Sequence, residues 1–195
     1  EKLDGVDCVY LNYYFYAEMS VAKRLLELSA DYEAPDLEYI SKEIRRVEKE
    51  TGVTLALEQR MAVAEAMSSG VLIITGGPGT GKTTTINTII RILKQEDLDV
   101  VLAAPTGRAA KRMTEATGVE AQTIHRLLGV NFMGEDNRRQ TFDKNEDDPI
   151  EADVIIVDES SMVDIALMQA LLRAVESGSR IIFVGDVDQL PSGGA

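Results

Sequence analysis

The sequence predicts a three-layer α/β domain with a mostly parallel central sheet, and two patterns support this prediction. Four short apolar runs are continuous rather than alternating, which is typical of parallel strands buried on both faces. They lie at residues 71–75, 100–104, 154–157 and 181–184. Helical patterns separate them, at residues 83–95, 109–117 and 165–176. This alternation of strands and helices predicts a ligand site at the carboxyl ends of the strands.

The chain is expected to contain two parts. Residues 1–36 are interpreted as the end of an N-terminal domain and its linker, with a boundary at Ala34-Pro35-Asp36, and residues 37–195 as the α/β domain. Helices are expected at residues 37–49 and 57–67.

The first part is rich in aromatic residues. Residues 7–16 have the β-branched and aromatic composition of a strand, and residues 17–28 have helical spacing. Five aromatic side chains crowd into residues 10–16, which favours a packing seam between domains. A platform for stacking single-stranded bases is the alternative.

Residues 131–148 interrupt the alternation of strands and helices. They are polar, with Gly134-Glu135-Asp136-Asn137 near the centre, and are interpreted as a hairpin-like insert. A disordered surface loop is the alternative.

Composition restricts the class of protein. Hydrophobic residues make up 45% and charged residues 27% of the 195 residues, as in ordinary globular domains. Cys8 is the only cysteine and His125 the only histidine, which excludes an internal disulfide and argues against a zinc site. This cysteine usage, the lack of an apolar run of about 18 residues and the lack of a signal-peptide pattern favour the cytoplasm over a membrane.

The net charge of −13 argues by itself against nucleic acid as a partner. The charge is unevenly distributed, however, because residues 103–126 contain four arginines and lysines against two glutamates. This segment is either a local basic face that binds phosphates weakly and in a salt-dependent way, or a set of solvated charges.

Residues 76–83 form a complete GxxxxGK[ST] phosphate-binding loop, placed between a strand and a helix as the motif requires. Glycines allow backbone N–H groups to curl around phosphates, and the helix N-terminus adds its dipole. Lys82 is expected to contact the β- and γ-phosphates of ATP, and the Thr83 hydroxyl to bind Mg²⁺. The expected nucleotide contacts in this loop are Gly76, Gly77, Pro78, Gly79, Thr80, Gly81, Lys82, Thr83 and Thr84.

Two further segments carry side chains suited to catalysis. Asp158 and Glu159 follow an apolar run, as in a Walker B segment, where Asp158 is expected to hold Mg²⁺ and Glu159 to polarise the attacking water. Gln189 follows the next apolar run and can sense the γ-phosphate or position water, because its amide both donates and accepts. The alternatives are an ordinary acidic strand end for the pair and a turn for Gln189.

Six motifs occur in a fixed order along the chain. They are LALEQ ending at Gln59, GGPGTGKTTT from Gly76, AAPTGRAA from Ala103, TIHRLLG from Thr123, VDESSMVD from Val157 and GDVDQLPS from Gly185. This set resembles the RecD-like DNA helicases of superfamily 1, which include the alpha subunit of exodeoxyribonuclease V and its free-standing relatives. The resemblance covers about residues 37–192 and implies a RecA-like P-loop NTPase fold that moves 5′ to 3′ on DNA.

The resemblance also implies roles for single residues. Gln59 would hold the adenine edge, with a plain helix-surface residue as the alternative. The residues that would meet the DNA backbone are Pro105, Thr106, Arg108, Thr123 and His125. His125 has a role in the core as its alternative. The insert at residues 131–148 would match a small hairpin that helps to split the duplex.

The leading interpretation is therefore the ATP-binding half of an ATP-dependent DNA helicase in recombination or repair, with ATP and Mg²⁺ as cofactors. Its expected partners are single-stranded and duplex DNA, the second motor domain of the same protein, and other recombination subunits if the parent works in a complex. Because the second motor domain and its arginines are missing, we expect very slow hydrolysis by these residues alone. The alternatives are another P-loop NTPase or kinase that does not act on DNA, and a nucleotide-stabilised interaction module.

Overall fold

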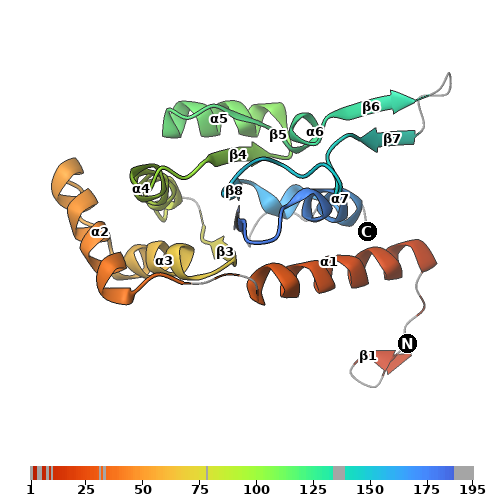
Figure 1. Ribbon diagram of the computed structural model, residues 1–195, viewed down its shortest axis with the longest axis horizontal. Helices are drawn as coiled ribbons and strands as arrows, with labels where there is room; N and C mark the ends of the chain where they lie inside the picture. Colours follow the sequence, from red (N-terminus) through yellow and green to blue (C-terminus); the bar gives the residue numbers. More distant parts are fainter. Residues whose placement is uncertain are drawn as a thin grey trace.

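The computed structural model describes residues 2–3, 6–7, 9, 11–30, 32, 34–77, 79–133 and 139–186. Its centre is a five-stranded sheet in which every neighbouring pair of strands is parallel (Figure 1). The order across the sheet is β3 (Val71–Thr75), β9 (Arg180–Gly185), β8 (Val154–Val157), β4 (Val100–Ala104) and β5 (Ala121–Thr123). The predicted parallel α/β fold is confirmed, and β5 is a strand that the sequence pattern did not reveal.

Alternate residues of the strands enter two separate hydrophobic cores. On β8, Val154 and Ile156 pack into one core, whereas Ile155 and Val157 pack into the other, and all four are fully buried. Helices cover both faces, which explains why the strand sequences are continuously apolar.

The helices divide between the two faces according to the core they enter. Those on the first face are α2 (Leu37–Thr51), α3 (Leu57–Ser68), α4 (Lys82–Gln95) and α5 (Gly107–Thr117). Those on the second face are α1 (Asn12–Ala30), α6 (Ile124–Leu127) and α7 (Ile165–Ala174). None of the helices in the described part of the chain is both long enough and apolar enough to cross a membrane.

The ends of α2 show how local sequence sets a helix boundary. The Asp36 side chain accepts a hydrogen bond from the backbone N–H of Glu38, which satisfies a donor at the start of the helix. Gly52 ends the helix with φ of 68°, a left-handed conformation that glycine adopts without strain. The helix pattern predicted for residues 37–49 is therefore found with one extra half-turn.

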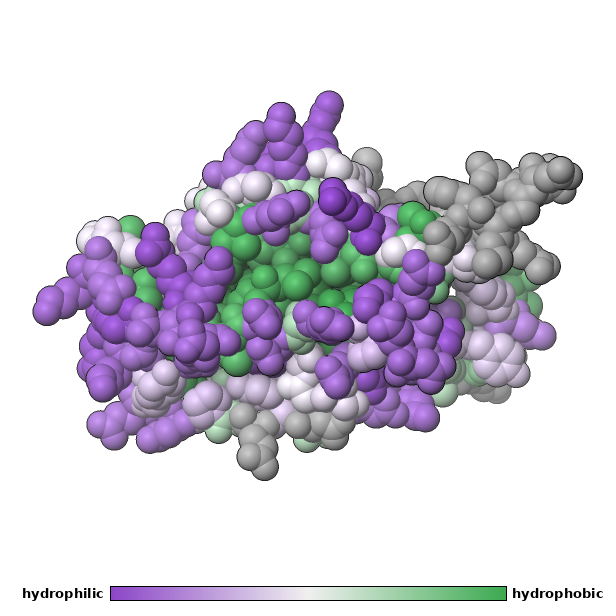
Figure 2. All heavy atoms as spheres, turned by 45° about the horizontal axis from the view of Figure 1, so that its top comes forward, coloured by the Kyte–Doolittle hydropathy of each residue, from purple (hydrophilic) through white to green (hydrophobic). Residues whose placement is uncertain are grey.

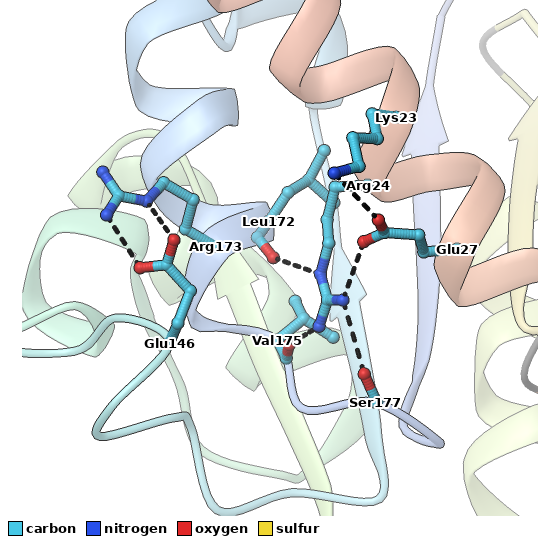
Figure 3. Close-up of polar contacts among 8 residues, drawn as sticks. All are labelled: Lys23, Arg24, Glu27, Glu146, Leu172, Arg173, Val175 and Ser177. Carbon is cyan, nitrogen blue, oxygen red and sulfur yellow. Dashed lines mark hydrogen bonds and ion pairs between the residues drawn. The ribbon is translucent and has the colours of Figure 1, made fainter.

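The long helix α1 packs along α7 on the second face of the sheet. Leu28 is fully buried in that core, and Arg24 fastens the two helices together (Figure 3). Its guanidinium donates to the carbonyl oxygens of Val175 at 2.6 Å and Leu172 at 3.4 Å, and forms an ion pair with Glu27 at 3.2 Å. A cation at the last carbonyls of a helix also complements its dipole. The domain boundary drawn at residue 36 remains a prediction, but α1 is in direct contact with the α/β core.

The aromatic stretch at the start of α1 is helical and not extended, contrary to its strand-like composition. Tyr13 and Tyr16 are 60% and 67% exposed, and Tyr14 is 37% exposed. Tyr13 and Tyr14 meet edge to face, with ring centroids 5.4 Å apart. These rings lie on the surface of the described structure, and Tyr10 lies outside the described residues.

Apolar side chains also reach the surface elsewhere. Ile73 on the edge strand β3 is 64% exposed, and Leu26 on α1 is 73% exposed. Figure 2 shows one face of the molecule, with an apolar hollow near its middle surrounded by hydrophilic side chains. Part of the apolar surface of the domain is therefore accessible.

A two-stranded antiparallel sheet lies where the insert was expected. Strands β6 (Val130–Met133) and β7 (Arg139–Phe142) pair with Val130 opposite Phe142 and Met133 opposite Arg139. The segment after β7 lies against α7, because Glu146 in this segment forms an ion pair with Arg173 of α7 at 2.7 Å. Residues 134–138, at the centre of the expected insert, lie outside the described residues.

Two other short elements complete the described chain. Strands β1 (Lys2–Leu3) and β2 (Val6–Asp7) pair antiparallel near the N-terminus. A 3₁₀ turn, η1 (Ser160–Met162), follows β8. Because the five strands of the main sheet are parallel, their carboxyl ends and the turns that follow lie at a single edge, which is where the candidate site is found.

Candidate functional site

The loop between β3 and α4 has the backbone shape of a phosphate cradle. Gly79 and Gly81 have φ of 79° and 82°, in the left-handed region. A Cβ on Gly81 would lie 2.2 Å from the Gln59 side-chain nitrogen, and one on Gly76 would lie 2.7 Å from the Thr80 hydroxyl oxygen. A side chain at either position would displace Gln59 or Thr80, and at Gly81 it would also be strained by the positive φ. The loop leads directly into the first turn of α4.

The Lys82 ammonium lies over this loop. It donates hydrogen bonds to the carbonyl oxygens of Gly76 and of Gly77, the latter at 3.2 Å, and lies 4.0 Å from the Asp186 carboxylate. Asp186 is buried at the end of β9 and is 8% exposed. These partners hold the only cation on the loop at its mouth, where the oxygens of a bound phosphate could replace them.

Asp158 and Glu159 stand at the end of β8. The Asp158 backbone N–H donates to the Ala103 carbonyl at 2.9 Å, which continues the ladder with β4, and the Glu159 backbone N–H donates to the Asp158 carboxylate at 2.9 Å. Glu159 has φ of 53° and ψ of 37°, a left-handed conformation that is strained for a residue with a side chain. Strain of this kind is concentrated at functional sites, where it aims a side chain.

The Asp158 carboxyl is electrostatically unusual. Burial raises its pKa above the ordinary 3.8, and the neighbouring Glu159 carboxylate raises it further. The Glu159 N–H and the Lys82 ammonium act in the opposite direction and lower the pKa. A carboxylate that is only partly compensated by its neighbours is suited to a further cation.

These side chains line one cavity of about 290 Å³ at the carboxyl edge of the sheet. It joins Lys82 and Thr83 of α4 to Asp158 and Glu159 after β8 and to Asp186 after β9. Its other lining residues are Ile86, Arg112, Met113, Ala116, Thr117 and Gly185. The structure thus brings the predicted catalytic lysine and acidic pair together, although their sequence positions are far apart.

The cavity has the donor set of a magnesium–phosphate site and not of a closed metal centre. The Thr83 hydroxyl and the Asp158 carboxylate are hard oxygen donors of the kind that Mg²⁺ prefers, and both residues line the cavity. Among the described residues, no cluster of three histidine, cysteine or acidic side chains is arranged to hold a metal. Mg²⁺ commonly uses one or two protein ligands together with substrate phosphates and water, so these residues fit an ion that arrives with a nucleotide.

Gln59 connects α3 to the phosphate-binding loop. Its side-chain oxygen accepts from the backbone N–H of Ala56 at 2.9 Å, and its side-chain nitrogen donates to the Thr80 carbonyl at 3.3 Å. The first contact satisfies a donor at the helix start, and the second reaches the loop. Thr84, also predicted as a nucleotide contact, lies one residue beyond Thr83 in α4, and its carbonyl accepts from the Thr88 hydroxyl at 3.0 Å.

The residues predicted to meet DNA lie at the ends of the neighbouring strands β4 and β5. Ala104 pairs with Thr123 in the sheet, and Pro105 and Thr106 follow Ala104 directly. The hydroxyl oxygens of Thr106 and Thr123 accept backbone hydrogen bonds at the starts of α5 and α6, at 3.2 and 3.1 Å. Neither hydroxyl donates a hydrogen bond to another described residue, so each hydrogen is available to a further acceptor.

Two more predicted DNA contacts flank this edge. Arg108 is exposed in the first turn of α5. His125 is half-buried in α6, with its ring 6.1 Å from that of Phe142 and tilted by 52°. His125 therefore makes a packing contact of the kind that its alternative role in the core requires.

Other predicted residues cannot be placed, and two further ones emerge from the structure. Gln189 and Pro78 lie outside the described residues. Asp186 and Arg112 line the cavity, but neither was named as a site residue from the sequence. Asp186 directly follows a strand end, and this position was the signal available for it. Arg112 could be found only by knowing which side of α5 faces the cavity.

A larger cavity of about 470 Å³ lies between α1 and α7, away from the phosphate-binding loop. Most of its charged side chains are engaged with one another, because Arg24 pairs with Glu27 and Arg173 pairs with Glu146 (Figure 3).

A protein-family model described as "AAA domain" matches residues 59–195, which include the loop, the acidic pair and the cavity. The chain belongs to the AAA domain family, and it is RecD-like. The ATP-dependent RecD2 DNA helicase of Deinococcus radiodurans is 38% identical over 187 residues, which are 96% of this chain and 25% of that protein. The RecBCD enzyme subunit RecD of Mycolicibacterium smegmatis is 39% identical over 158 residues, which are 69% of this chain and 28% of that protein.

Solved structures agree on the fold of this AAA domain. The crystal structure of the Pif1 helicase from Candida albicans superposes with a TM-score of 0.50 at 26% identity, over 72% of this chain and 34% of that chain. The chain spans about a quarter of the length of the RecD2 and RecD proteins to which it was compared. The resemblance to RecD-like superfamily 1 helicases that the six motifs predicted is confirmed.

Proposed function

We propose that this AAA domain is the ATP-binding motor half of an ATP-dependent DNA helicase. The observation that carries the proposal is the single cavity that joins Lys82, Thr83, Asp158 and Glu159 at the carboxyl edge of the sheet. The similarity to proteins named as RecD2 and RecD helicases supports DNA as the substrate.

ATP hydrolysis in this cavity would proceed by attack of water on the γ-phosphorus. A bond forms between the water oxygen and that phosphorus, and the bond from the phosphorus to the oxygen shared with the β-phosphate breaks, so that ADP leaves with this oxygen. Glu159 accepts a proton from the attacking water, and Lys82 stabilises the charge on the β- and γ-phosphates.

Thr83 and Asp158 would hold Mg²⁺, which shields the phosphate charges when it is bound with the nucleotide. Gln59 would hold the adenine from the α3 side of the loop, and its contact with the Thr80 carbonyl supports this role. Gln189, as the γ-phosphate sensor, completes the proposed set.

The DNA-contacting edge would comprise Pro105, Thr106, Arg108, Thr123 and His125. The hydroxyl hydrogens of Thr106 and Thr123, which are not donated to any described residue, can each donate to a phosphate oxygen while the hydroxyl oxygens remain helix caps. Such contacts position a strand without reading its bases, so we expect binding that is independent of sequence.

Translocation requires two domains that close and open around ATP. We propose that the second motor domain lies in the remaining length of the full protein, as the share of the RecD2 and RecD relatives that this chain spans suggests. Movement from 5′ to 3′, a role in recombination or repair, and a location in the cytoplasm remain predictions.

Isothermal titration of Mg²⁺–ATP and Mg²⁺–ADP into the wild-type chain and into Lys82→Ala tests the proposal. We expect both nucleotides to bind the wild type, and Lys82→Ala to bind them at least about tenfold more weakly, because charge-assisted contacts to phosphate are lost. Equal binding by the two proteins would show that the loop is not the site. Nucleotide binding without any binding of single-stranded DNA by the full protein would favour an NTPase that does not act on DNA.

A further inference from the structure

One wall of the nucleotide cavity is formed by α5, the helix that starts at the proposed DNA-contacting edge. The cavity-lining residues of α5 are Arg112, Met113, Ala116 and Thr117. Met113 lies one position after Arg112, Ala116 four and Thr117 five, so the four residues lie on the same side of the helix. This stripe faces Lys82 and Thr83 on α4 and the acidic pair after β8.

Arg112 is the only cation that α5 contributes to this wall. Among the described residues, its guanidinium makes no hydrogen bond or ion pair, although Arg24, Arg46 and Arg173 elsewhere in the structure are held by carbonyl or carboxylate oxygens. The preceding residue, Lys111, is 3.9 Å from Glu115, with 80% of its side chain exposed. Arg112 is exposed as well, but unlike Lys111 it lines the cavity.

The charges around the cavity are suited to an anion held between two cations. The wall contains the carboxylates of Asp158, Glu159 and Asp186, and the ammonium of Lys82 lies 4.0 Å from one of them. A phosphoryl group that enters beside these carboxylates needs positive charge on more than one side. Lys82 supplies it from the loop, and Arg112 is available on the opposite helix.

We propose that Arg112 binds the γ-phosphoryl group of the nucleoside triphosphate from within this domain. The proposal rests on the function proposed above, in which the cavity takes Mg²⁺–ATP. A guanidinium suits this position because its planar fork can donate two parallel hydrogen bonds to phosphate oxygens. Ala116, one turn further along α5, also lines the cavity.

Arg112 and the residues of the phosphate-binding loop would contact different phosphates of the nucleotide. The glycine loop and Lys82 contact phosphates that ADP also carries, whereas Arg112 would contact only the third phosphate. Substitution of Arg112 should therefore change the preference for triphosphate over diphosphate, and leave the affinity for diphosphate almost unchanged.

The experiment measures binding of Mg²⁺–ADP and of the magnesium complex of AMP-PNP, a non-hydrolysable triphosphate, to the 195-residue chain by calorimetry. We expect Arg112→Ala to weaken AMP-PNP binding about tenfold and ADP binding by less than about twofold, as for loss of a hydrogen-bonded charge contact. Arg112→Lys should fall between wild type and Arg112→Ala, because a charge remains but the fork is lost. Lys111→Ala, a substitution of the neighbouring cation, should leave both affinities unchanged.

Three outcomes would overturn the proposal. Equal weakening of ADP and AMP-PNP binding by Arg112→Ala would assign Arg112 to support of the helix or loop. Unchanged binding of both would show that it does not contact the nucleotide. Failure of the wild-type chain to bind either nucleotide would remove the proposed function itself, and with it this inference. Thermal unfolding of each variant without nucleotide confirms that the fold is intact.

Discussion

The Lys82 ammonium lies 4.0 Å from the Asp186 carboxylate, so the lysine of the phosphate-binding loop is linked to the end of the neighbouring strand β9. A bound triphosphate would compete with this carboxylate for the same ammonium. Asp186 is also the third acidic side chain on the cavity wall, after Asp158 and Glu159.

Replacement of Asp186 by asparagine should therefore tighten nucleotide binding in the absence of Mg²⁺. The change removes one negative charge next to the phosphates and one competitor for Lys82, and we expect a gain of about threefold to tenfold, as for a single partly screened charge interaction. Calorimetric titration with ATP in the presence of a chelator measures it. Asp97→Asn makes the same change of charge in an exposed turn and should have no effect. Weaker binding by Asp186→Asn would mean that the carboxylate positions Lys82 for the nucleotide.

The two hydrogen bonds of the Gln59 side chain, with the Ala56 N–H and with the Thr80 carbonyl, can be tested separately by substitution. In Gln59→Glu, a carboxylate can still accept from the Ala56 N–H but can no longer donate to the Thr80 carbonyl or to a base. We expect about fivefold weaker ATP binding, a smaller preference for ATP over GTP, and an unchanged free energy of unfolding.

Gln59→Ala removes both contacts of Gln59 and serves as the comparison. It should weaken binding to the same extent and also lower the free energy of unfolding by about 0.5–1.5 kcal/mol, as for loss of a helix-capping contact. If Gln59→Glu retains full affinity and base preference, Gln59 acts only at the start of α3.

Much of the fold could be predicted because its strands are buried on both faces. Residues 71–75, 100–104 and 154–157 were predicted as strands and are β3, β4 and β8 with the same bounds. The strand β5 was missed because Ala121–Thr123 is three residues long and includes a glutamine, so it has no apolar run. Residues 12–16 were misread because their aromatic composition favours strands, whereas they form the first turns of α1, a helix that packs on α7.

The phosphate loop and the acidic pair were predictable because their chemistry is local in the sequence. The roles suggested for Asp186, Arg112 and Arg24 depend on contacts between distant segments. Arg24 is held by the carbonyl of a residue 151 positions later, and no periodicity or motif in the sequence encodes that contact. The roles of single site residues remain predictions that substitutions can test.

The raised pKa of Asp158 predicts that its charge destabilises the nucleotide-free chain. An acid whose pKa is higher in the folded state than in the unfolded state contributes most to stability below the unfolded value, and this contribution is lost as the pH rises through the folded pKa. Asp158→Asn keeps the acceptor for the Glu159 N–H and removes the charge. The variant should therefore unfold at a higher temperature than wild type at pH 7.

Unfolding measured between pH 3 and pH 7 tests this sign. The advantage of Asp158→Asn should be absent below the ordinary pKa of 3.8 and should grow as the pH rises above it. The same variant should lose the tightening of nucleotide binding by Mg²⁺. A variant that is less stable than wild type at pH 7 would show that the Asp158 carboxylate is fully compensated by its neighbours.

DNA binding should be weak, independent of sequence and strongly salt-dependent, because it rests on phosphate contacts in a protein with a net charge of −13. Arg108→Ala should weaken binding to all single-stranded sequences equally and reduce the slope of log K against log salt concentration by about 1. Arg91→Ala removes an equal charge from the exposed side of α4 and should leave the slope unchanged. Fluorescence anisotropy with labelled oligonucleotides measures both, and tight binding that persists at high salt would contradict the account.

The most direct test of the half-motor proposal is steady-state release of phosphate from ATP. It compares the 195-residue chain with a form extended through the second motor domain, each with and without single-stranded DNA. In the 195-residue chain, Lys82 and the proposed contact from Arg112 reach the phosphates from this domain only. An arginine supplied by the second motor domain, across the cleft between the two domains, is worth about 10³–10⁵ in rate. We predict very slow turnover that DNA does not stimulate, and a fast, DNA-stimulated rate in the extended form. Equal rates in the two forms would mean that the site is complete within these residues and that the half-motor account is wrong.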